Sequence, residues 1–447
     1  MRRRREIIAV VITVCFSLGY LTASLLDVIS IRYLLQNLLT AYLLAWAVYG
    51  LCSTVSRAEL VTRFSLPTVS ITSCLILVEV PSLFQFLDYR ALLGSYDENA
   101  LSAPGRHADR ELLWRHDAYY QFDVPYQGNL GLALCLPPDP SRNISVKYDR
   151  HGFRNKSDLA AADIVVLGDS YIEGYMMPEG FTVTTRLSQL QGKVVANLGH
   201  SGYGPQQELV VLKRYGFSLQ PKTVIWAFFE GNDFDDLDYY GKQLPRQTSP
   251  LWQTIWYRSF TRNALAQLVY PTRGCIKSST IGKLQARFTD ERNHTSPVFF
   301  APTEVHQLSQ EKLIKTIAYL GEAARLCRER NIQFVVAFIP EKYRVYRGLR
   351  NVELGSGTIR SWEVSSLPDE MGRRLAELDL GVEYVDLTQP LQEASQQGIA
   401  TYLPDDTHWT EAGNLVVAQI LDRTLRFLPP STQHTLQAHH VGGLPDR

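Results

Sequence analysis

The stretch Ile164-Val165-Val166-Leu167-Gly168-Asp169-Ser170 decides the fold of this 447-residue chain. A short run of apolar, mostly β-branched residues bounded by glycine is typical of a buried parallel strand. Ser170 follows this run, at the carboxyl end of the predicted strand, where open α/β sheets bind their ligands. The stretch therefore predicts an α/β sheet that presents a serine hydroxyl at its binding edge.

The alternation of strand and helix continues along the chain from about residue 161 to 428. The predicted strands are 163–167, 194–198, 223–229, 332–339 and 382–387, and the predicted helices are 182–191, 205–215, 308–330, 367–378 and 411–427. Such alternation indicates parallel βαβ units in a three-layer α/β sandwich. One long interruption, residues 235–302, is rich in aromatic residues, and we interpret it as an insertion or lid over the sheet.

Three apolar runs, 7–26, 33–56 and 64–87, follow four arginines at the N-terminus. The first two are uncharged and long enough to cross a membrane as helices. The third contains Glu79, which is costly in lipid, so we expect it near the outer interface. The arginines, with Arg57 and Arg63 in the second loop, predict a cytoplasmic start and three spans. Everything after about residue 88 then lies outside the cytoplasm, whereas two spans would leave it inside.

The chain is thus divided into four parts. These are a membrane region of two to three transmembrane helices (1–87), an irregular or β-containing segment without visible chemistry (88–160), the α/β domain (161–428) and a disordered polar tail (429–447). Lys plus Arg and Asp plus Glu both number 45, and no basic stripe is present, so we expect no nucleic-acid partner. The six cysteines contain no CxxC pair, which argues against a zinc site. The sequence neither predicts nor excludes a disulfide between Cys135 and Cys275.

Four polar segments follow predicted strands or precede the last helix, and in a parallel sheet they would converge at one edge. They are 168–170, 197–204, 230–233 and 405–409. Ser170 needs a base, which His408 supplies, and an acid that orients the imidazole. Asp405 is preferred for that role over its neighbour Asp406, because adjacent side chains seldom reach the same ring edge.

An oxyanion needs fixed hydrogen-bond donors. The candidates are the backbone N–H groups of Ser170 and Gly202 and the side-chain amide of Asn232. The acidic residues around 233–238 do not have the spacing of a calcium-binding loop, and we interpret them as a solvated loop.

Taken in order, these segments resemble the SGNH hydrolases, also called GDSL-type esterases and lipases, over about residues 161–428. Ser170, Gly202, Asn232 and the Asp405/His408 pair match the family's four blocks. The resemblance implies a flavodoxin-like sandwich with five parallel strands, and chemistry that requires no metal or organic cofactor. The chain departs from the family pattern in two places. Glu230 stands where the third block usually begins with glycine. The first block continues with Tyr171-Ile172-Glu173 and lacks the leucine that completes the strict GDSL form.

Residues 339–346 and Trp409 are similar to membrane-associated SGNH proteins that acetylate bacterial surface polysaccharides. We predict a serine esterase of the bacterial inner membrane that hydrolyses O-acyl esters, including acylated glycans, through an acyl-enzyme in an extracytoplasmic domain. With a carbohydrate hydroxyl as acceptor instead of water, the same site would be an O-acyltransferase for a cell-surface polysaccharide. A non-catalytic scaffold of the envelope is the third hypothesis.

Overall fold

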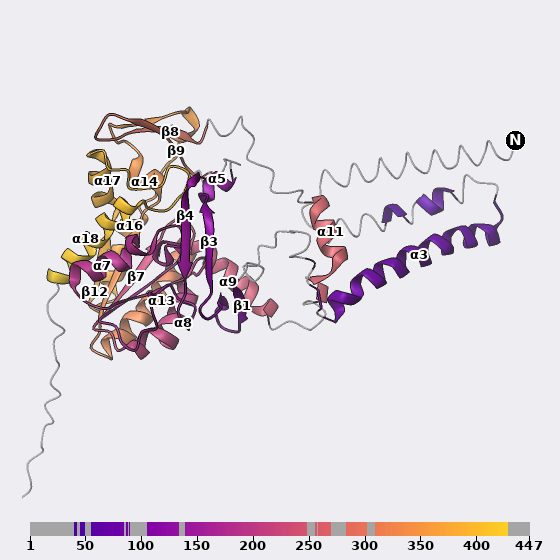
Figure 1. The fold of residues 1–447 in the computed structure, drawn as a ribbon, viewed down its shortest axis with the longest axis horizontal. Coiled ribbons are helices and arrows are strands. Elements are labelled where there is room, and N and C mark those ends of the chain that lie inside the picture. The colour runs from indigo at the N-terminus through magenta and orange to yellow at the C-terminus, as the bar shows by residue number, and fades with distance from the viewer. Residues whose placement is uncertain are drawn as a thin grey trace, which may run out of the picture. The chain divides into compact units, whose positions relative to one another are not determined.

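The computed structural model describes most of the chain, in ranges separated by gaps (Figure 1). The described residues are 40–42, 45–49, 55–84, 86–87, 89, 105–133, 139–247, 255–256, 258–269, 283–301 and 309–427. The apolar run 7–26, most of the run 33–56, both members of the Cys135–Cys275 pair and the predicted tail lie outside these ranges. The chain divides into two compact units, one of residues 1–102 and 248–274, the other of residues 103–247 and 275–447.

Within the described part of the first unit, helix α3 (Arg57–Leu83) is long and apolar enough to cross a membrane. Its start is fixed by the Ser56 side chain, which accepts the Glu59 N–H as an N-cap. The expectation that Arg57 and Arg63 lie in a loop is therefore wrong, because the cap precedes both and both are helical. The helix contains nearly all of the third predicted apolar run.

Glu79 of α3 is satisfied by a second helix of the same unit, α11 (Phe260–Val269). Its carboxylate accepts the N–H of Phe260 at 2.8 Å and of Thr261 at 2.6 Å. These are the first N–H groups of α11, which have no partner within the helix and carry the positive end of its dipole. The Tyr89 ring packs on Phe260 with centroids 5.3 Å apart. Part of the predicted insertion thus provides partners for the one acidic side chain of the third apolar run.

The second unit is built on a five-stranded parallel sheet with the strand order β12-β10-β7-β5-β6. The strands are β5 (Ile164–Gly168), β6 (Val195–Gly199), β7 (Thr223–Phe229), β10 (Gln333–Ile339) and β12 (Val382–Asp386). Every residue of β5 and β7 is buried, as expected for central strands covered on both faces. The five predicted parallel strands are confirmed. Because β6 and β7 flank β5 on opposite sides, the chain reverses direction across the sheet at β5, where α/β folds bind ligands.

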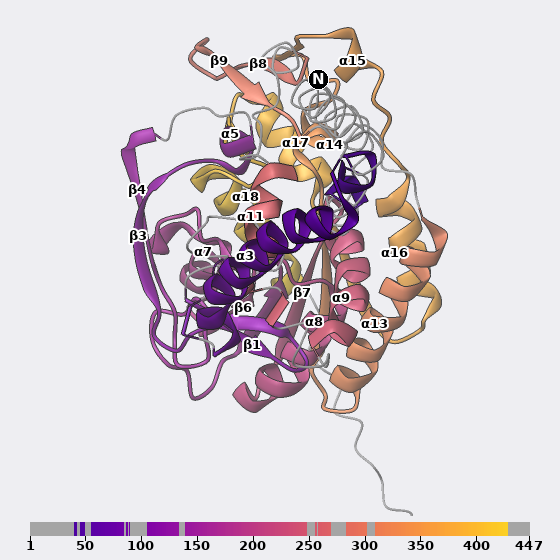
Figure 2. The same cartoon turned by 90° about the vertical axis from the view of Figure 1, so that its right-hand side faces the viewer.

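Helices cover both faces of this sheet (Figures 1 and 2). One layer consists of α8 (Pro205–Val211), α9 (Asp233–Gln247), α13 (Gln310–Arg328) and α16 (Leu367–Glu377). The other consists of α7 (Val183–Gln191), α14 (Lys342–Tyr346), α17 (Thr388–Gln396) and α18 (Glu411–Phe427). Short helical turns lie at Ser170–Glu173 (α6), Glu179–Phe181, Leu212–Gly216, Phe217–Leu219 and Gly357–Arg360 (α15). The predicted three-layer sandwich is therefore present.

The predicted insertion has three parts. Residues 233–247 form α9 of the sandwich, and residues 248–274 belong to the first unit. The last part forms β8 (Gln285–Thr289) and β9 (Thr295–Phe299), which pair with β11 (Val352–Leu354) in an antiparallel sheet. Ala286, Phe288 and Val298 of this sheet belong to the main hydrophobic core. This last part is consequently a packed element of the domain.

The segment before the sandwich contains two antiparallel pairs of strands. They are β1 (Arg106–Asp109) with β2 (Leu113–His116), and β3 (Gln121–Tyr126) with β4 (Asp139–Lys147), and α5 (Asn129–Ala133) lies between β3 and β4. Tyr126, Ile144 and Val146 pack with Met176, Met177 and Leu403 in a second, smaller core. The β3–β4 pair is thereby attached to the residues that follow α6 and to the loop before α18.

Candidate active site

Ser170 is the first residue of α6 and follows β5 directly. Asp169 caps this helical turn, because its side chain accepts the N–H of Tyr171 at 2.9 Å. Asp169 is fully buried and its second carboxylate oxygen lies 3.4 Å from Ser170 Oγ. The serine is therefore held at the carboxyl end of a central strand, as the sequence predicts.

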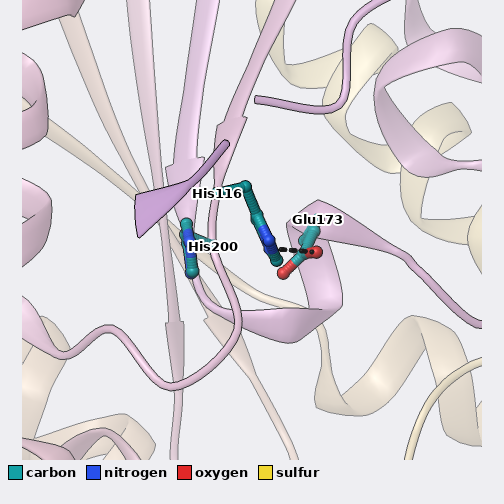
Figure 3. Close-up of side chains that lie close together, drawn as sticks. All are labelled: His116, Glu173 and His200. Atoms are coloured by element: carbon teal, nitrogen blue, oxygen red, sulfur yellow. Dashed lines mark hydrogen bonds and ion pairs between the residues drawn. The ribbon is translucent and has the colours of Figure 1, made fainter. Parts of the chain in front are cut away.

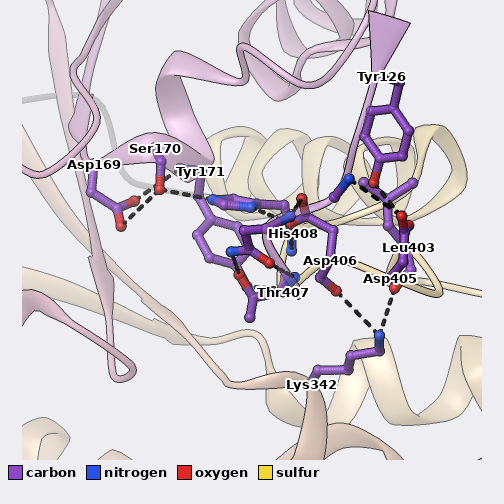
Figure 4. A network of polar contacts seen from close by, with 12 residues as sticks. Tyr126, Asp169, Ser170, Tyr171, Lys342, Leu403, Asp405, Asp406, Thr407 and His408 are labelled. Atoms are coloured by element: carbon purple, nitrogen blue, oxygen red, sulfur yellow. Dashed lines mark hydrogen bonds and ion pairs between the residues drawn. The ribbon is translucent and has the colours of Figure 1, made fainter. Parts of the chain in front are cut away.

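Ser170, His408 and Asp406 form a continuous hydrogen-bonded chain (Figure 4). Ser170 Oγ lies 2.7 Å from His408 Nε2, and His408 Nδ1 lies 2.5 Å from Asp406 Oδ1. A carboxylate only accepts hydrogen bonds, so the Nδ1–H donates to Asp406 and leaves Nε2 to accept the serine proton. Both His408 and Asp406 are buried. The arrangement is that of a serine nucleophile, a base and an orienting acid.

The pKa of Asp406 is held below its usual range. Burial acts to raise it, but the charge and hydrogen bonds of His408 and the N–H of Asn129 outweigh burial. Asp406 is thus ionised at neutral pH and able to stabilise a positively charged His408 ring.

The prediction that Asp405 orients His408 is wrong in this structure. The Asp405 carboxylate instead accepts hydrogen bonds from the Tyr126 hydroxyl at 3.1 Å and the Gly128 N–H at 3.3 Å. The chain turns tightly after Asp406, so that one Asp406 oxygen accepts both the backbone N–H of His408 at 2.8 Å and its ring Nδ1–H. This local turn, typical of aspartate, brings the acid two residues before the histidine to its ring and points the preceding side chain away.

The segment with no predicted chemistry, before the sandwich, holds the other side of this loop. The N–H of Asn129 donates to Asp406 Oδ2 at 2.8 Å, its side-chain oxygen accepts the Thr407 N–H at 3.0 Å, and its amide donates to Thr407 Oγ1 at 2.7 Å. Gly131 N–H donates to the Asp405 carbonyl at 2.8 Å. Gly128 approaches so closely that a Cβ there would lie 2.1 Å from the Asp405 carbonyl oxygen. Residues 128–131 therefore fix the loop that carries the candidate acid and base.

Lys342, the first residue of α14, contacts the same loop (Figure 4). Its buried ammonium lies 2.6 Å, 3.0 Å and 3.1 Å from the carbonyl oxygens of Leu403, Pro404 and Asp406. Burial lowers the pKa of Lys342 to about 7, which the charges of Asp406 and Asp405 partly oppose. Lys342 belongs to the stretch 339–346, whose similarity to proteins that acetylate surface polysaccharides was the sequence signal that could have identified it.

The two remaining predicted donors follow β6 and β7, the strands on either side of β5. Gly202 has the left-handed conformation, with φ of 77°, that glycine adopts without strain. Asn232 precedes α9, and its amide donates to the Asp236 carboxylate and interacts with Asp169 beside Ser170. Ser170, Gly202 and Asn232 thus follow three adjacent strands at one edge of the sheet. Their role as oxyanion donors remains a prediction.

Asp233, the residue after Asn232, is buried, and Asp236 is partly buried. Asp233 and Asp236 belong to α9, and Asp233 Oδ2 accepts the Phe229 N–H at 2.8 Å. Burial raises the pKa of Asp233 well above its usual value, and that of Asp236 to about 7, reinforced by the nearby charge of Asp169. The interpretation of residues 233–238 as a loop is wrong, because they form the first turns of α9, in which Asp233 is buried while Asp235 remains exposed to solvent.

Glu230, the departure from the family's third block, is paired with Arg344. Arg344 donates from Nε and Nη2 to the two Glu230 oxygens, at 2.7 Å each, and both side chains are buried. Glu230 Oε1 also accepts the Glu341 N–H at 2.8 Å. The departures at 230 and at 339–346 therefore form one structural unit, which joins the ends of β7 and β10.

His116, Glu173 and His200 are close enough together to be considered as metal ligands (Figure 3). The two imidazole rings, however, are stacked, with centroids 4.3 Å apart and planes at 18°. A metal ion binds in the plane of an imidazole ring, along the nitrogen lone pair, so one ion cannot serve both stacked rings. The Glu173 oxygens are already bonded to Ser201, Tyr148 and His116. This arrangement does not fit a metal ion.

Comparison with known proteins found similarities over about a third of this chain. Residues 299–442 match the protein-family model described as "SGNH hydrolase-like domain, acetyltransferase AlgX". The chain is 28% identical over 148 residues to the "Probable alginate O-acetylase AlgJ" of Azotobacter vinelandii, a match that covers 33% of each protein. The chain therefore spans about a third of the length of that curated relative. The matched family stretch contains Asp406 and His408 and begins after Ser170.

Two solved structures that the comparison matched are as follows. One is a putative lipolytic protein of the G-D-S-L family from Desulfitobacterium hafniense, with 13% identity, coverage of 58% of this chain and 97% of that chain, and a TM-score of 0.31. The other is an acetyl-xylooligosaccharide esterase from Geobacillus, with 12% identity, coverage of 61% and 97%, and a TM-score of 0.32. Over residues 299–442 the chain therefore resembles an SGNH hydrolase-like domain of the acetyltransferase type, and its five-stranded parallel sheet is the fold that the sequence blocks predict. The predicted resemblance is confirmed.

Proposed function

We propose that this protein is a serine acyltransferase that moves an O-acyl group, such as acetyl, onto a cell-surface polysaccharide. The observation that carries the proposal is the hydrogen-bonded chain Ser170–His408–Asp406 at the edge of the sheet. A serine hydroxyl is a weak nucleophile, and a base in direct hydrogen-bond contact is what activates it.

In the first step, Ser170 Oγ attacks the carbonyl carbon of the acyl donor while His408 Nε2 takes the hydroxyl proton. Asp406 stabilises the resulting imidazolium through Nδ1–H. The tetrahedral intermediate then collapses, the bond to the leaving group breaks, and the leaving group receives the proton from His408. This step leaves the acyl group on Ser170 as an ester.

In the second step, an acceptor hydroxyl attacks the Ser170 ester while His408 Nε2 takes its proton. The Ser170 Oγ–acyl bond breaks and the serine recovers the proton. In both steps the oxyanion would be stabilised by the N–H groups of Ser170 and Gly202 and by the Asn232 amide. We assign Asp406, rather than Asp405, to the acid role.

The nature of the acceptor separates two candidate functions. The match to an acetyltransferase family and to an alginate O-acetylase supports a polysaccharide hydroxyl as acceptor. With water as acceptor, the same two steps give the esterase expected from the GDS block. Exclusion of water from the acyl-enzyme distinguishes the two reactions.

We further propose that the chain is anchored in the bacterial inner membrane with the SGNH domain in the periplasm. The length and apolar character of α3 and the arginines near the N-terminus support this topology. An envelope polysaccharide would be accessible to a domain on that side.

The test uses the full chain purified in detergent, beside Ser170→Ala. Wild-type protein should release p-nitrophenol from p-nitrophenyl acetate in an initial burst, and a polysaccharide acceptor with free, non-acetylated hydroxyls should raise the turnover rate. Ser170→Ala should show neither effect. Turnover that is insensitive to polysaccharide would favour the esterase. If the folded wild-type protein is not labelled at Ser170 by an active-site-directed phosphonate, the non-catalytic scaffold is the better hypothesis.

A further inference from the structure

Glu173 is a buried carboxylate on the same helical turn as Ser170. It is the last residue of α6 and is 1% exposed. One of its oxygens accepts the N–H of Ser201 at 2.5 Å and also the Ser201 hydroxyl. The other accepts from the Tyr148 hydroxyl and from His116 Nε2, at 3.1 Å for the latter (Figure 3). Four donors from three separate segments thus converge on one side chain.

The surroundings of Glu173 favour its ionised form. Burial acts to raise the pKa of Glu173, but the charge and hydrogen bond of His116 outweigh burial and hold it well below its usual range. Burial and the charge of His116 lower the pKa of His200. Glu173 is therefore an ionised acceptor, and its hydrogen bonds to Ser201 are charge-assisted and strong.

Ser201 lies in the turn that carries Gly202. His200 N–H donates to the Gly168 carbonyl at 3.0 Å, and Tyr203 N–H donates to the His200 carbonyl at 3.1 Å, which closes the turn. Gly202 itself has positive φ and belongs to no helix or strand. The hydrogen bonds from Ser201 to Glu173 are thus a direct connection between this turn and the helical turn of Ser170.

A column of stacked rings also supports the contact between the 200–203 turn and Glu173. His116 stacks on Tyr148 at 4.0 Å and on His200 at 4.3 Å, and His200 stacks on Tyr203 at 4.1 Å between centroids. The column joins β2, the residue that follows β4 and the 200–203 turn, and it holds His116 in place to donate to Glu173. Two of the four donors to Glu173 therefore come from the column.

From this geometry we infer that Glu173 is a positioning residue that fixes the turn 200–203 against α6 and so aims the Gly202 N–H at the carbonyl attacked by Ser170. The inference rests on the proposed acyl-transfer function. Removing the charge on Glu173 would loosen the turn while leaving Ser170, His408 and Asp406 in contact. The expected defect therefore lies in stabilisation of the oxyanion and spares proton transfer.

The test compares Glu173→Gln with Ser201→Ala and Tyr148→Phe in the full chain. Glu173→Gln should lower kcat by about tenfold to a hundredfold with KM nearly unchanged, since a donor misplaced by a fraction of an ångström loses much of its effect. Ser201→Ala removes one of the two hydrogen bonds from Ser201 and should give a smaller loss of kcat. Tyr148→Phe leaves both of them intact and should stay close to wild type.

The pH profile tests whether the defect spares proton transfer, because a general disturbance of the site would also shift the profile. The apparent pKa of the kcat/KM profile should be the same in Glu173→Gln and wild type, because the His408–Asp406 pair is untouched. Full activity in both Glu173→Gln and Ser201→Ala would overturn the inference, and so would equal losses in all three variants. If Glu173→Gln does not fold, the other two variants still test the inference. A lower kcat in Ser201→Ala than in Tyr148→Phe would support it, and equal kcat values would overturn it. Inactivity of the wild-type protein would instead contradict the proposed function.

Discussion

Asp406 and His408 are in contact through two atoms of the histidine, its backbone N–H at 2.8 Å and its ring Nδ1 at 2.5 Å, both directed at the same carboxylate oxygen. The contact fixes the ring both in position and in tautomer, because the Nδ1–H can face only the carboxylate. The adjacent Asp405 makes no such contact and instead bonds to Tyr126 and Gly128.

This difference gives a prediction for two neighbouring carboxylates. Asp406→Asn should lower kcat by about a hundredfold or more, because the amide permits the wrong tautomer and no longer stabilises the imidazolium. Asp405→Asn is the matched control and should cost less than about tenfold, the effect of weakening one or two hydrogen bonds. The measurement is the rate of p-nitrophenyl acetate turnover at saturating substrate. A larger loss of kcat in Asp405→Asn than in Asp406→Asn would return the role of the orienting acid to Asp405, as the sequence analysis expects.

Gly128 allows the residues before the sandwich to approach the loop of the candidate acid and base. A Cβ at this position would lie 2.1 Å from the Asp405 carbonyl oxygen, so Gly128→Ala should displace the loop and destabilise the fold by about 1–3 kcal/mol. Gly180→Ala is the control, because a Cβ there meets nothing within 4 Å. Thermal unfolding in detergent measures both variants. Equal unfolding temperatures for the two would show that residues 128–131 do not restrain the loop.

Glu230 and Arg344 should behave as a strongly coupled pair. Glu230→Gln alone leaves the buried Arg344 without its charge partner and should cost about 3–5 kcal/mol of unfolding free energy. The double variant with Arg344→Met should cost clearly less than the sum of the single variants, as a double-mutant cycle would show. The exposed pair Lys213–Glu322 is the control and should contribute about 0–1 kcal/mol. Additive effects at Glu230 and Arg344 would contradict the coupling.

The sandwich could be predicted because its signals are local. The unbroken apolar runs of β5 and β7 require burial on both faces, and the glycine and polar residues after them indicate where the strands end. The pairing of Ser170 with His408 followed from the rule that parallel strands present their carboxyl ends on one edge.

The parts that could not be predicted depend on contacts between distant residues or on a local turn. Asn129 meets the loop of Asp406 across 277 residues, and Glu230 meets Arg344 across 114, so neither pair has a local pattern. The choice of Asp406 over Asp405 depends on a backbone turn that spacing alone does not specify. The burial of Asp233 became visible only once α9 was seen to pack in the helical layer.

Lys342 makes stability depend on pH. Burial lowers its pKa in the folded protein to about 7, whereas the lysine in the unfolded chain titrates near the ordinary value of 10.5. Between these values the unfolded state binds more protons than the folded state, so this residue makes the unfolding free energy rise with pH, by at most about 1.4 kcal/mol per pH unit. Lys342→Met removes this dependence but also the three hydrogen bonds to the loop.

The expected outcome is therefore a difference in slope. Between pH 7.5 and 9.5 the wild-type protein should gain stability relative to Lys342→Met, measured by denaturant unfolding at several pH values in the same detergent. Lys222→Met, at a side chain that is 84% exposed, should run parallel to wild type over the same range. Parallel curves for wild type and Lys342→Met would mean that the three carbonyl oxygens keep the ammonium charged in the folded state. In that case the lysine would act as a permanent cation beneath the loop of Asp406 and His408.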